Sequence, residues 1–263
     1  MRAPLGTVGR TGIYFVDDRT VIFSHKDPAI ISQVLSSHYN KIAEYMASNK
    51  LVINDDKTHL LVMAPRRLAG RRQEVVVQAG EFNITPTETE KILGIRIHQS
   101  MTWNHHVKNG EGAVLRQLTT RVNGLRKLSN RADKQTKLAL ANCIVISKLA
   151  YGLEMWGNCQ GYLRKALQVQ QLTAARAVCG YKSYYWSTGK LLSSCKWLSV
   201  NQMYWQQVFT TTHKITISKK PVNLHQRMTA QHEHSTASLR WYSLFFFPPI
   251  FIVRHRNLLA GGG

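Results

Sequence analysis

Two adjacent carboxylates, Asp17 and Asp18, are the residues of this chain whose types and spacing best suit chemistry. They lie between two short apolar and aromatic runs, 13–16 and 20–23, which predict a hairpin with the acid pair at its tip. Carboxylates in such a place stay hydrated or bind a cation, and Mg²⁺ (or Mn²⁺) with substrate phosphates suits them. Two such ions would promote phosphoryl transfer. The alternative is a plain solvated turn, because Asp is a common turn residue.

The elements that must position this pair follow from local signals. Asp27-Pro28 is typical of a helix start, and apolar residues at helical spacing follow it. Short strand-like runs then continue as far as residue 97, and after Trp103 the apolar spacing becomes helical. Helices are expected over 115–128, 138–149, 163–178 and, with a break near Ser199, 191–208. The spacing therefore predicts an α+β fold with an all-α rear portion and a boundary near residues 104–112.

The charge of the chain favours a polyanionic partner. The formal net charge is +21, of which residues 155–263 carry +12 with Glu233 as their only acid. Each phosphate that a basic side chain neutralises releases condensed counterions, which favours nucleic acid. A membrane is not expected as a partner, because the basic residues are scattered and no apolar run approaches the roughly 20 residues of a spanning helix.

The cysteines and histidines give weaker signals. The four cysteines form no C-x-x-C pair, which argues against a zinc ribbon or a disulfide scaffold and favours a reducing compartment, the nucleus or the cytoplasm. No secretory signal is recognised. His232 and His234, with His225, could form a metal site, but an H-x-H pair without cysteine is usually a surface feature.

Five blocks, taken together and in order, resemble the reverse transcriptases of non-LTR (LINE-type, jockey-like) retrotransposons. The resemblance covers roughly residues 13–235, and the ordered set is more specific than any one block. The blocks are Phe15-Val16-Asp17-Asp18, Asn54 with Lys57-Thr58, Leu93-Gly94 through Trp103 and His106, Ser147-Lys148-Leu149-Ala150-Tyr151-Gly152 with Trp156-Gly157, and Trp197-Leu198-Ser199-Val200.

The resemblance implies an RNA-directed DNA polymerase, a nucleotidyltransferase that uses an RNA template, a DNA primer and deoxynucleotides. In that family the primer 3′-hydroxyl attacks the α-phosphate of a deoxynucleotide at a two-metal site. Asp17 and Asp18 would be catalytic, Asp17 as a metal ligand and Asp18 in support. Lys57 would meet the pyrophosphate side of the nucleotide as a general acid, which suits an ammonium near developing negative charge. A solvated turn lysine beside Asp55-Asp56 is the alternative.

The implied fold is an incomplete antiparallel palm sheet with a packed helix, followed by an all-α, thumb-like region. The expected division is 1–12 as an unassigned lead, 13–107 as a partial palm, 108–240 as the helical thumb and downstream region, and 241–263 as a poorly ordered tail. A palm sheet without its neighbouring strands would expose an edge.

The sequence also departs from the family pattern. The family's first catalytic Asp lies on an upstream palm strand, whereas Asp17 is the earliest acid in this chain. The chain is therefore expected to be inactive by itself, unless another chain supplies the missing fingers and palm.

The competing interpretation is a non-catalytic basic module that holds a primer–template duplex. Basic residues of the helical region would then follow the phosphate backbone. The candidates are Arg116, Arg121, Arg126, Lys127, Arg131, Lys134 and Lys137. The two interpretations differ in whether Asp17→Ala abolishes a Mg²⁺-dependent activity.

Overall fold

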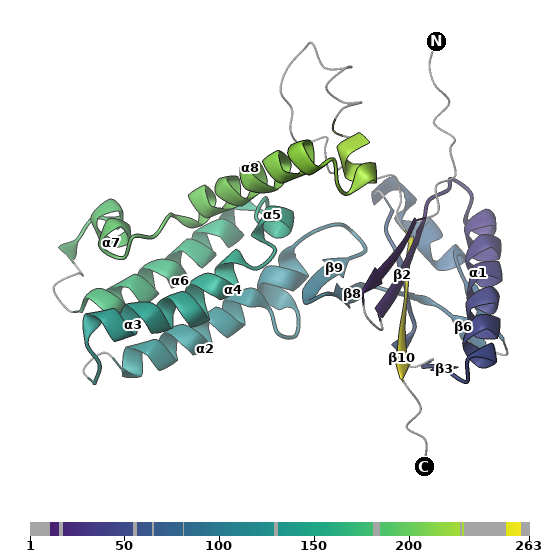
Figure 1. Ribbon diagram of the computed structural model, residues 1–263, viewed down its shortest axis with the longest axis horizontal. Coiled ribbons are helices and arrows are strands. Elements are labelled where there is room, and N and C mark those ends of the chain that lie inside the picture. The colour runs from purple at the N-terminus through teal and green to yellow at the C-terminus, as the bar shows by residue number, and fades with distance from the viewer. Residues whose placement is uncertain are drawn as a thin grey trace, which may run out of the picture. The chain divides into compact units, whose positions relative to one another are not determined.

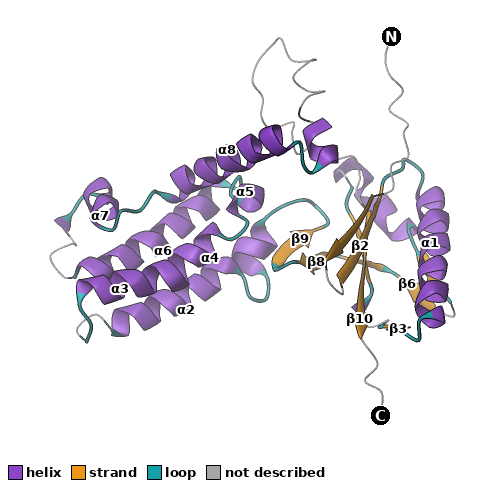
Figure 2. Cartoon of the chain, viewed as in Figure 1, coloured by secondary structure: helices purple, strands orange, loops and turns teal. Residues whose placement is uncertain are grey.

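The chain forms two units in this computed structural model, which describes residues 11–15, 18–54, 57–64, 66–80, 82–128, 131–180, 185–226, 228 and 251–258. The described residues among 1–93, 97–101 and 245–263 make unit 1, and those among 94–96 and 102–244 make unit 2. Unit 1 holds the sheets and one long helix, whereas unit 2 is almost entirely helical (Figures 1 and 2). The predicted α+β fold with a helical rear region is confirmed.

The expected hairpin is present at the start of the described chain. Strand β1 (Thr11–Phe15) pairs antiparallel with β2 (Asp18–Phe23), and Phe15 lies opposite Asp18 at the closing end. Only residues 16 and 17 separate the two strands, a loop length typical of tight hairpins. Apolar and β-branched residues on both strands favour this pairing.

Strand β10 (Phe251–Leu258) lies in the middle of the main sheet, between β2 and β4 (His59–Val62). It pairs antiparallel with both, and its last residues pair with β3 (Val52–Ile53). The sequence did not predict a strand for these eight residues of the 241–263 segment, and β10 pairs with the side of β2 that faces away from β1. The physical reason is that a β-branched and aromatic run can satisfy the backbone groups of two neighbouring strands at once.

The rest of unit 1 consists of short elements around this sheet. Strand β7 (Pro86–Thr87) pairs with β4 in parallel, so the sheet is mixed and not purely antiparallel as expected. A parallel pairing requires a crossover, and the chain makes one between the two strands. The crossover and the following hairpin contain η2 (Arg66–Glu74), β5 (Val77–Ala79), β6 (Phe82–Ile84), β8 (Thr89–Ile92) and β9 (Ile95–His98).

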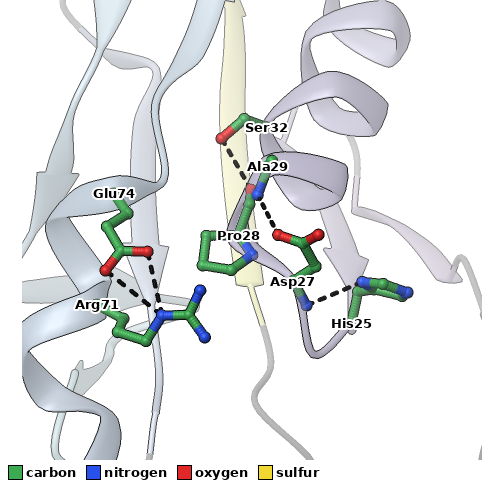
Figure 3. Close-up of polar contacts among 7 residues, drawn as sticks. All are labelled: His25, Asp27, Pro28, Ala29, Ser32, Arg71 and Glu74. Carbon is green, nitrogen blue, oxygen red and sulfur yellow. Dashed lines mark hydrogen bonds and ion pairs between the residues drawn. The ribbon is translucent and has the colours of Figure 1, made fainter.

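Helix α1 (Pro28–Ser48) begins where the sequence predicts. Asp27 is its N-cap, since its Oδ1 accepts a hydrogen bond of 3.0 Å from the backbone N–H of Ala29, and Pro28 occupies the first helical position (Figure 3). Ser32 Oγ donates to the carbonyl of Pro28 and accepts from the N–H of Val76, so it ties α1 to the chain that enters β5.

Two apolar clusters hold unit 1 together. The first lies between α1 and the strands and includes Phe23, Leu35 and Leu60. The second is smaller and consists of Leu61 and Met63 with the half-buried Ile22, Ile92 and Ile97. β4 contributes to both clusters because successive residues of a strand point to opposite faces.

Unit 2 has a single large core into which its helices direct their apolar stripes. The buried positions of α2 (Val114–Lys127) follow the predicted spacing of three or four residues. The next three elements, α3 (Lys134–Ala141), η4 (Asn142–Ile146) and α4 (Ser147–Ala150), form one continuous helical segment over 134–150. The other elements are η3 (His105–Asn109), α5 (Leu153–Trp156), α6 (Gly161–Cys179), α7 (Thr188–Ser194) and α8 (Val200–Ser218).

The predicted break near Ser199 has a clear cause. Ser199 is the N-cap of α8, and Ser199 and Gln202 form a reciprocal capping box. The preceding Trp197 Nε1 donates a 2.8 Å hydrogen bond to Asn142 Oδ1, which ties the α7–α8 connection to η4. Two helices therefore replace the one interrupted helix that periodicity indicated.

Candidate nucleic-acid interface

Of the carboxylate pair, the structure places Asp18 at one end of the unit 1 sheet. Asp17 is outside the described residues, and Asp18 is the first residue of β2. The register of β10 places Arg256 directly opposite Asp18 and His255 opposite Arg19. A basic stretch of the central strand therefore runs beside the acid-bearing end of the hairpin.

The segment with Asn54, Lys57 and Thr58 is a self-capped turn at the same end of the sheet. Asn54 Oδ1 accepts a 3.0 Å hydrogen bond from the N–H of Lys57, and the Asn54 carbonyl accepts one of 3.0 Å from Thr58 Oγ1. Thr58 is buried, whereas Lys57 is exposed. Asn54 and Thr58 therefore fix the turn, and the Lys57 side chain remains exposed to solvent. The neighbouring Asp55 and Asp56 lie outside the described residues.

The register of β10 relates this turn to the hairpin. Ile53 pairs with Asn257 and His59 with Arg254, so the turn falls opposite the intervening residues of β10. The topology thus brings the Asp18 end of β2 and the Lys57 turn to one end of the sheet, with β10 between them. Sequence reasoning expected the two motifs to belong together but did not anticipate a basic strand between them.

No three His, Cys, Asp or Glu side chains gather into a metal site among the side chains that the structure describes. The register partner of Asp18 on β10 is Arg256. With Asp17 outside the described residues, the Mg²⁺ or Mn²⁺ site stays a prediction, and no chemical step is derived through it. The suggested histidine site is likewise untested, since His232 and His234 lie outside the described residues.

The basic residues proposed for nucleic-acid contact fall into two groups. Five are exposed on α2, on α3 or between them, namely Arg116, Arg126, Lys127, Arg131 and Lys134. The other two serve the interior of unit 2: Arg121 Nη1 donates a 2.7 Å hydrogen bond to the carbonyl of Ile144, and Lys137 is buried. The prediction of a nucleic-acid role is therefore weakened for these two, because their positive groups are largely withdrawn from the surface.

A groove in unit 2 lies on this basic surface. It has a volume of about 690 Å³ and lies where η3, the first turns of α2 and the middle of α6 meet. Of the described residues that line it, Lys108 and Arg116 are cations and none is acidic. The remaining lining residues are Asn109, Gly110, Leu115, Thr119, Ala166, Val169 and Gln170.

An aromatic residue adjoins one of the two cations of the groove. The ammonium of Lys108 lies 5.9 Å from the centre of the Tyr162 ring, and Tyr162 is 53% exposed. Its hydroxyl is hydrogen-bonded to Asn104 Oδ1, which fixes the ring on the first turn of α6. Sequence reasoning missed Lys108 because it lies before α2, the first regular α-helix of unit 2, and its only signal was the charge itself.

Three motif residues of the later blocks, Trp103, His106 and Trp156, pack together in unit 2. The His106 ring lies against Trp103 and Trp156, with ring centres 6.4 and 5.4 Å away, and its Nδ1 accepts from the N–H of Arg96 at 3.2 Å. Burial, and then the positive charges of Lys148 and Arg96, lower the pKa of His106 to about 4. The imidazole is therefore neutral at physiological pH and acts as a structural acceptor.

The glycines of these blocks allow close approach. A Cβ on Gly157 would lie 2.4 Å from Tyr204 Cδ2, and one on Gly152, where φ is +62°, would lie 2.7 Å from Ile95 Cδ1. A Cβ on Gly94 would come within 3.4 Å of the Tyr151 ring. Each of these glycines therefore packs against a residue that is far away in the sequence. This close packing is a structural reason for glycine at these positions.

No protein-family model, curated protein or solved structure shows significant similarity to the chain. Among the described helices, none combines the length and apolar character that crossing a membrane requires.

Proposed function

We propose that this chain binds nucleic acid through the helical unit 2, as the primer–template-holding part of a reverse transcriptase of the non-LTR retrotransposon type. The observation that carries the proposal is the groove between α2 and α6, with two cations and no acidic residue among its described lining. The sequence around it adds to the positive electrostatic potential, because no acidic residue occurs between Glu154 and Glu233. Phosphate contacts of this kind fix a nucleic acid in place without reading its bases.

The exposed cations that follow α2 extend this surface. Arg126 and Lys127 end that helix, and Arg131 and Lys134 come directly after it or begin the next one. A nucleic-acid phosphate backbone that binds Arg116 would continue toward these residues along α2. We take an RNA template paired with a DNA primer as the ligand, as the resemblance implies. We take the nucleus or cytoplasm as the place of action, as the cysteine pattern favours a reducing compartment.

The test compares binding of a fluorescently labelled RNA–DNA duplex by the parent chain and by the double variant Lys108→Ala/Arg116→Ala. The double variant is expected to bind at least tenfold more weakly at moderate salt, because it loses two charge contacts. Lys41→Ala is the matched control, since it removes an exposed cation of α1 in unit 1, outside the groove. Equal binding by the parent and the double variant would overturn the role of the groove.

A second candidate function is nucleotidyl transfer by unit 1. It is favoured by the shared location of the Asp18 end of β2 and the Lys57 turn at one end of the sheet. In this proposal Asp17 and Asp18 hold Mg²⁺ and Lys57 meets the pyrophosphate of the deoxynucleotide. The sequence counts against it, because no acid precedes Asp17, whereas the family's first catalytic Asp lies on an upstream strand.

Primer extension on an RNA template with Mg²⁺ tests this second function. Because no carboxylate precedes Asp17 in this chain, we expect no extension by the 263-residue chain alone. Extension that Asp17→Ala abolishes would establish the enzyme. A partner chain that supplies fingers and the rest of the palm would be the component to add if extension appears only in its presence.

A further inference from the structure

The outward face of α8 carries an uncovered ridge of rings and apolar side chains. Trp205, Phe209, His213 and Ile217 follow one another at intervals of four residues, the spacing that forms a ridge along an α-helix. Trp205 is 40% exposed, Phe209 60% and Ile217 68%, and His213 is exposed as well. A contiguous row of this kind on a soluble surface marks a contact site more often than a scattered apolar residue does.

The opposite face of α8 fixes the direction of this ridge. Val200, Met203, Tyr204 and Ile215 are buried, and α8 packs on α5 and α6. Gln207 Nε2 adds a 2.9 Å hydrogen bond to the carbonyl of Ala150. The helix therefore cannot turn the ridge inward without breaking its own core contacts.

The rings of the ridge are already stacked upon one another. The Trp205 and Phe209 ring centres are 5.7 Å apart with an angle of 26° between the planes, and Tyr204 lies 5.1 Å from Trp205 beneath them. An aromatic surface held in this way loses little side-chain freedom when a further planar group stacks on it.

The charges of the chain segment that contains α8 favour one class of ligand. The one charged residue of α8 is Lys214, and every charged residue from 155 to 228 is basic. A cationic surface with exposed rings suits a polyanion that carries planar groups. Unpaired bases stack on aromatic side chains while basic residues follow the phosphates, whereas the bases of a duplex are already stacked within it.

We infer that the Trp205–Ile217 ridge is a binding site for single-stranded nucleic acid, on which unpaired bases stack. The inference rests on the proposed function in one respect, since it takes nucleic acid as the ligand of unit 2. It goes beyond that function by assigning unpaired strands to α8 and leaving the duplex to the groove between α2 and α6.

The test measures binding of a 12-nucleotide oligouridine and of a 12-base-pair RNA–DNA duplex by the full chain and three variants. Trp205→Ala removes the first ring, Trp205→Leu retains an apolar side chain without the ring, and Gln206→Ala is a control for an exposed neighbour outside the ridge. Both ring variants are expected to bind oligouridine about 5- to 150-fold more weakly and the duplex unchanged. Phe209→Leu, which keeps apolar bulk, is expected to show a smaller loss of the same kind.

The outcomes separate this inference from the proposed function. Failure of the parent chain to bind either ligand would overturn both. Normal oligouridine binding by Trp205→Ala, or full rescue by Trp205→Leu, would overturn the ridge alone, because apolar contact and not stacking would then suffice. Self-association of the parent chain that Trp205→Ala abolishes, together with unchanged oligouridine binding, would assign the ridge to a second copy of the chain.

Discussion

At the scale of single residues, the side chains that carry the resemblance act chiefly as packing and hydrogen-bonding groups. His106 accepts from the N–H of Arg96 between two tryptophans, and Asn54 holds the turn that presents Lys57. Each therefore has a measurable effect on stability that is independent of any chemistry.

Gly157→Ala is expected to destabilise unit 2 by about 1–3 kcal/mol, because the new methyl group overlaps both Tyr204 and the carbonyl of Leu153. Gly124→Ala is the matched control, since Gly124 lies within α2 and a Cβ there meets nothing within 4 Å. That control is expected to stabilise the helix by about 0.5–1 kcal/mol. Chemical unfolding followed by tryptophan fluorescence measures both changes, and equal effects of the two variants would contradict the packing described at Gly157.

The His106 environment predicts a loss of stability on acidification. The pKa of His106 is about 4 in the folded chain against an ordinary 6.5, so between these values the unfolded chain binds the extra proton. Stability therefore falls as the pH decreases from about 6.5 toward about 4, by about 2 kcal/mol between pH 7 and pH 5.

The measurement is the unfolding free energy of unit 2 at pH 7 and pH 5 in the parent chain and in His106→Gln. Glutamine retains an acceptor oxygen but does not titrate in this range. The variant is expected to lose about 2 kcal/mol less than the parent on acidification. An identical pH dependence in both chains would show that His106 is not buried in neutral form.

At the scale of elements, the central position of β10 is the feature with the largest consequences. β2 and β4 are joined only through it in the described sheet order, and their residues Phe23, Leu60 and Leu61 are fully buried. The core of unit 1 therefore depends on a strand that the chain contributes after it has completed unit 2.

Val253→Pro is expected to open the main sheet, because proline removes a ladder donor and is confined to edges and bulges. Val253 is the register partner of both Val21 and Leu60, so the change falls at the centre of the strand. Hydrogen exchange should show loss of protection at β2 and β4 amides, with unit 2 amides unchanged. Val253→Ala, which keeps the N–H, should retain most of the protection. Unchanged protection in the proline variant would mean that β10 is not a constituent strand.

Most of these elements could be predicted from local signals, and β10 could not. The Asp27-Pro28 helix start, the apolar spacing of α2 and the Ser199 break each depend on a few neighbouring residues. The place of β10 depends instead on two strands from the opposite end of the chain, and pairing at such a distance leaves no periodic signal. The sequence around β10 therefore indicated only a poorly ordered tail, because the strands that β10 pairs with could not be recognised from neighbouring residues.

The same distinction applies to the candidate interface. Charge identified Arg116 and its neighbours, but charge alone does not distinguish an exposed cation from Arg121, whose guanidinium serves a carbonyl of η4. Lys108 became part of the groove only because η3 and α6 meet there. The sequence therefore predicts that a basic surface exists, and the packing of helices decides which basic residues belong to it.

At the scale of the whole molecule, two units with different properties share one chain. Unit 1 holds the carboxylate hairpin beside a basic strand, and unit 2 holds the groove and the ridge on α8. The formal net charge of +21 favours association with polyanions in general, so binding alone does not show that a particular surface is used. The salt dependence of binding distinguishes specific charge contacts from this general attraction.

The most direct test of the central proposal is the dependence of duplex affinity on salt concentration in three chains. These are the parent, Lys108→Ala/Arg116→Ala and Asp17→Ala/Asp18→Ala. Loss of two phosphate contacts is expected to reduce the slope of log K against log salt by about 1.4–1.8 in the groove variant. The carboxylate variant should keep the parent slope and affinity. An unchanged slope in the groove variant, or a loss of binding confined to the carboxylate variant, would contradict a binding role for unit 2.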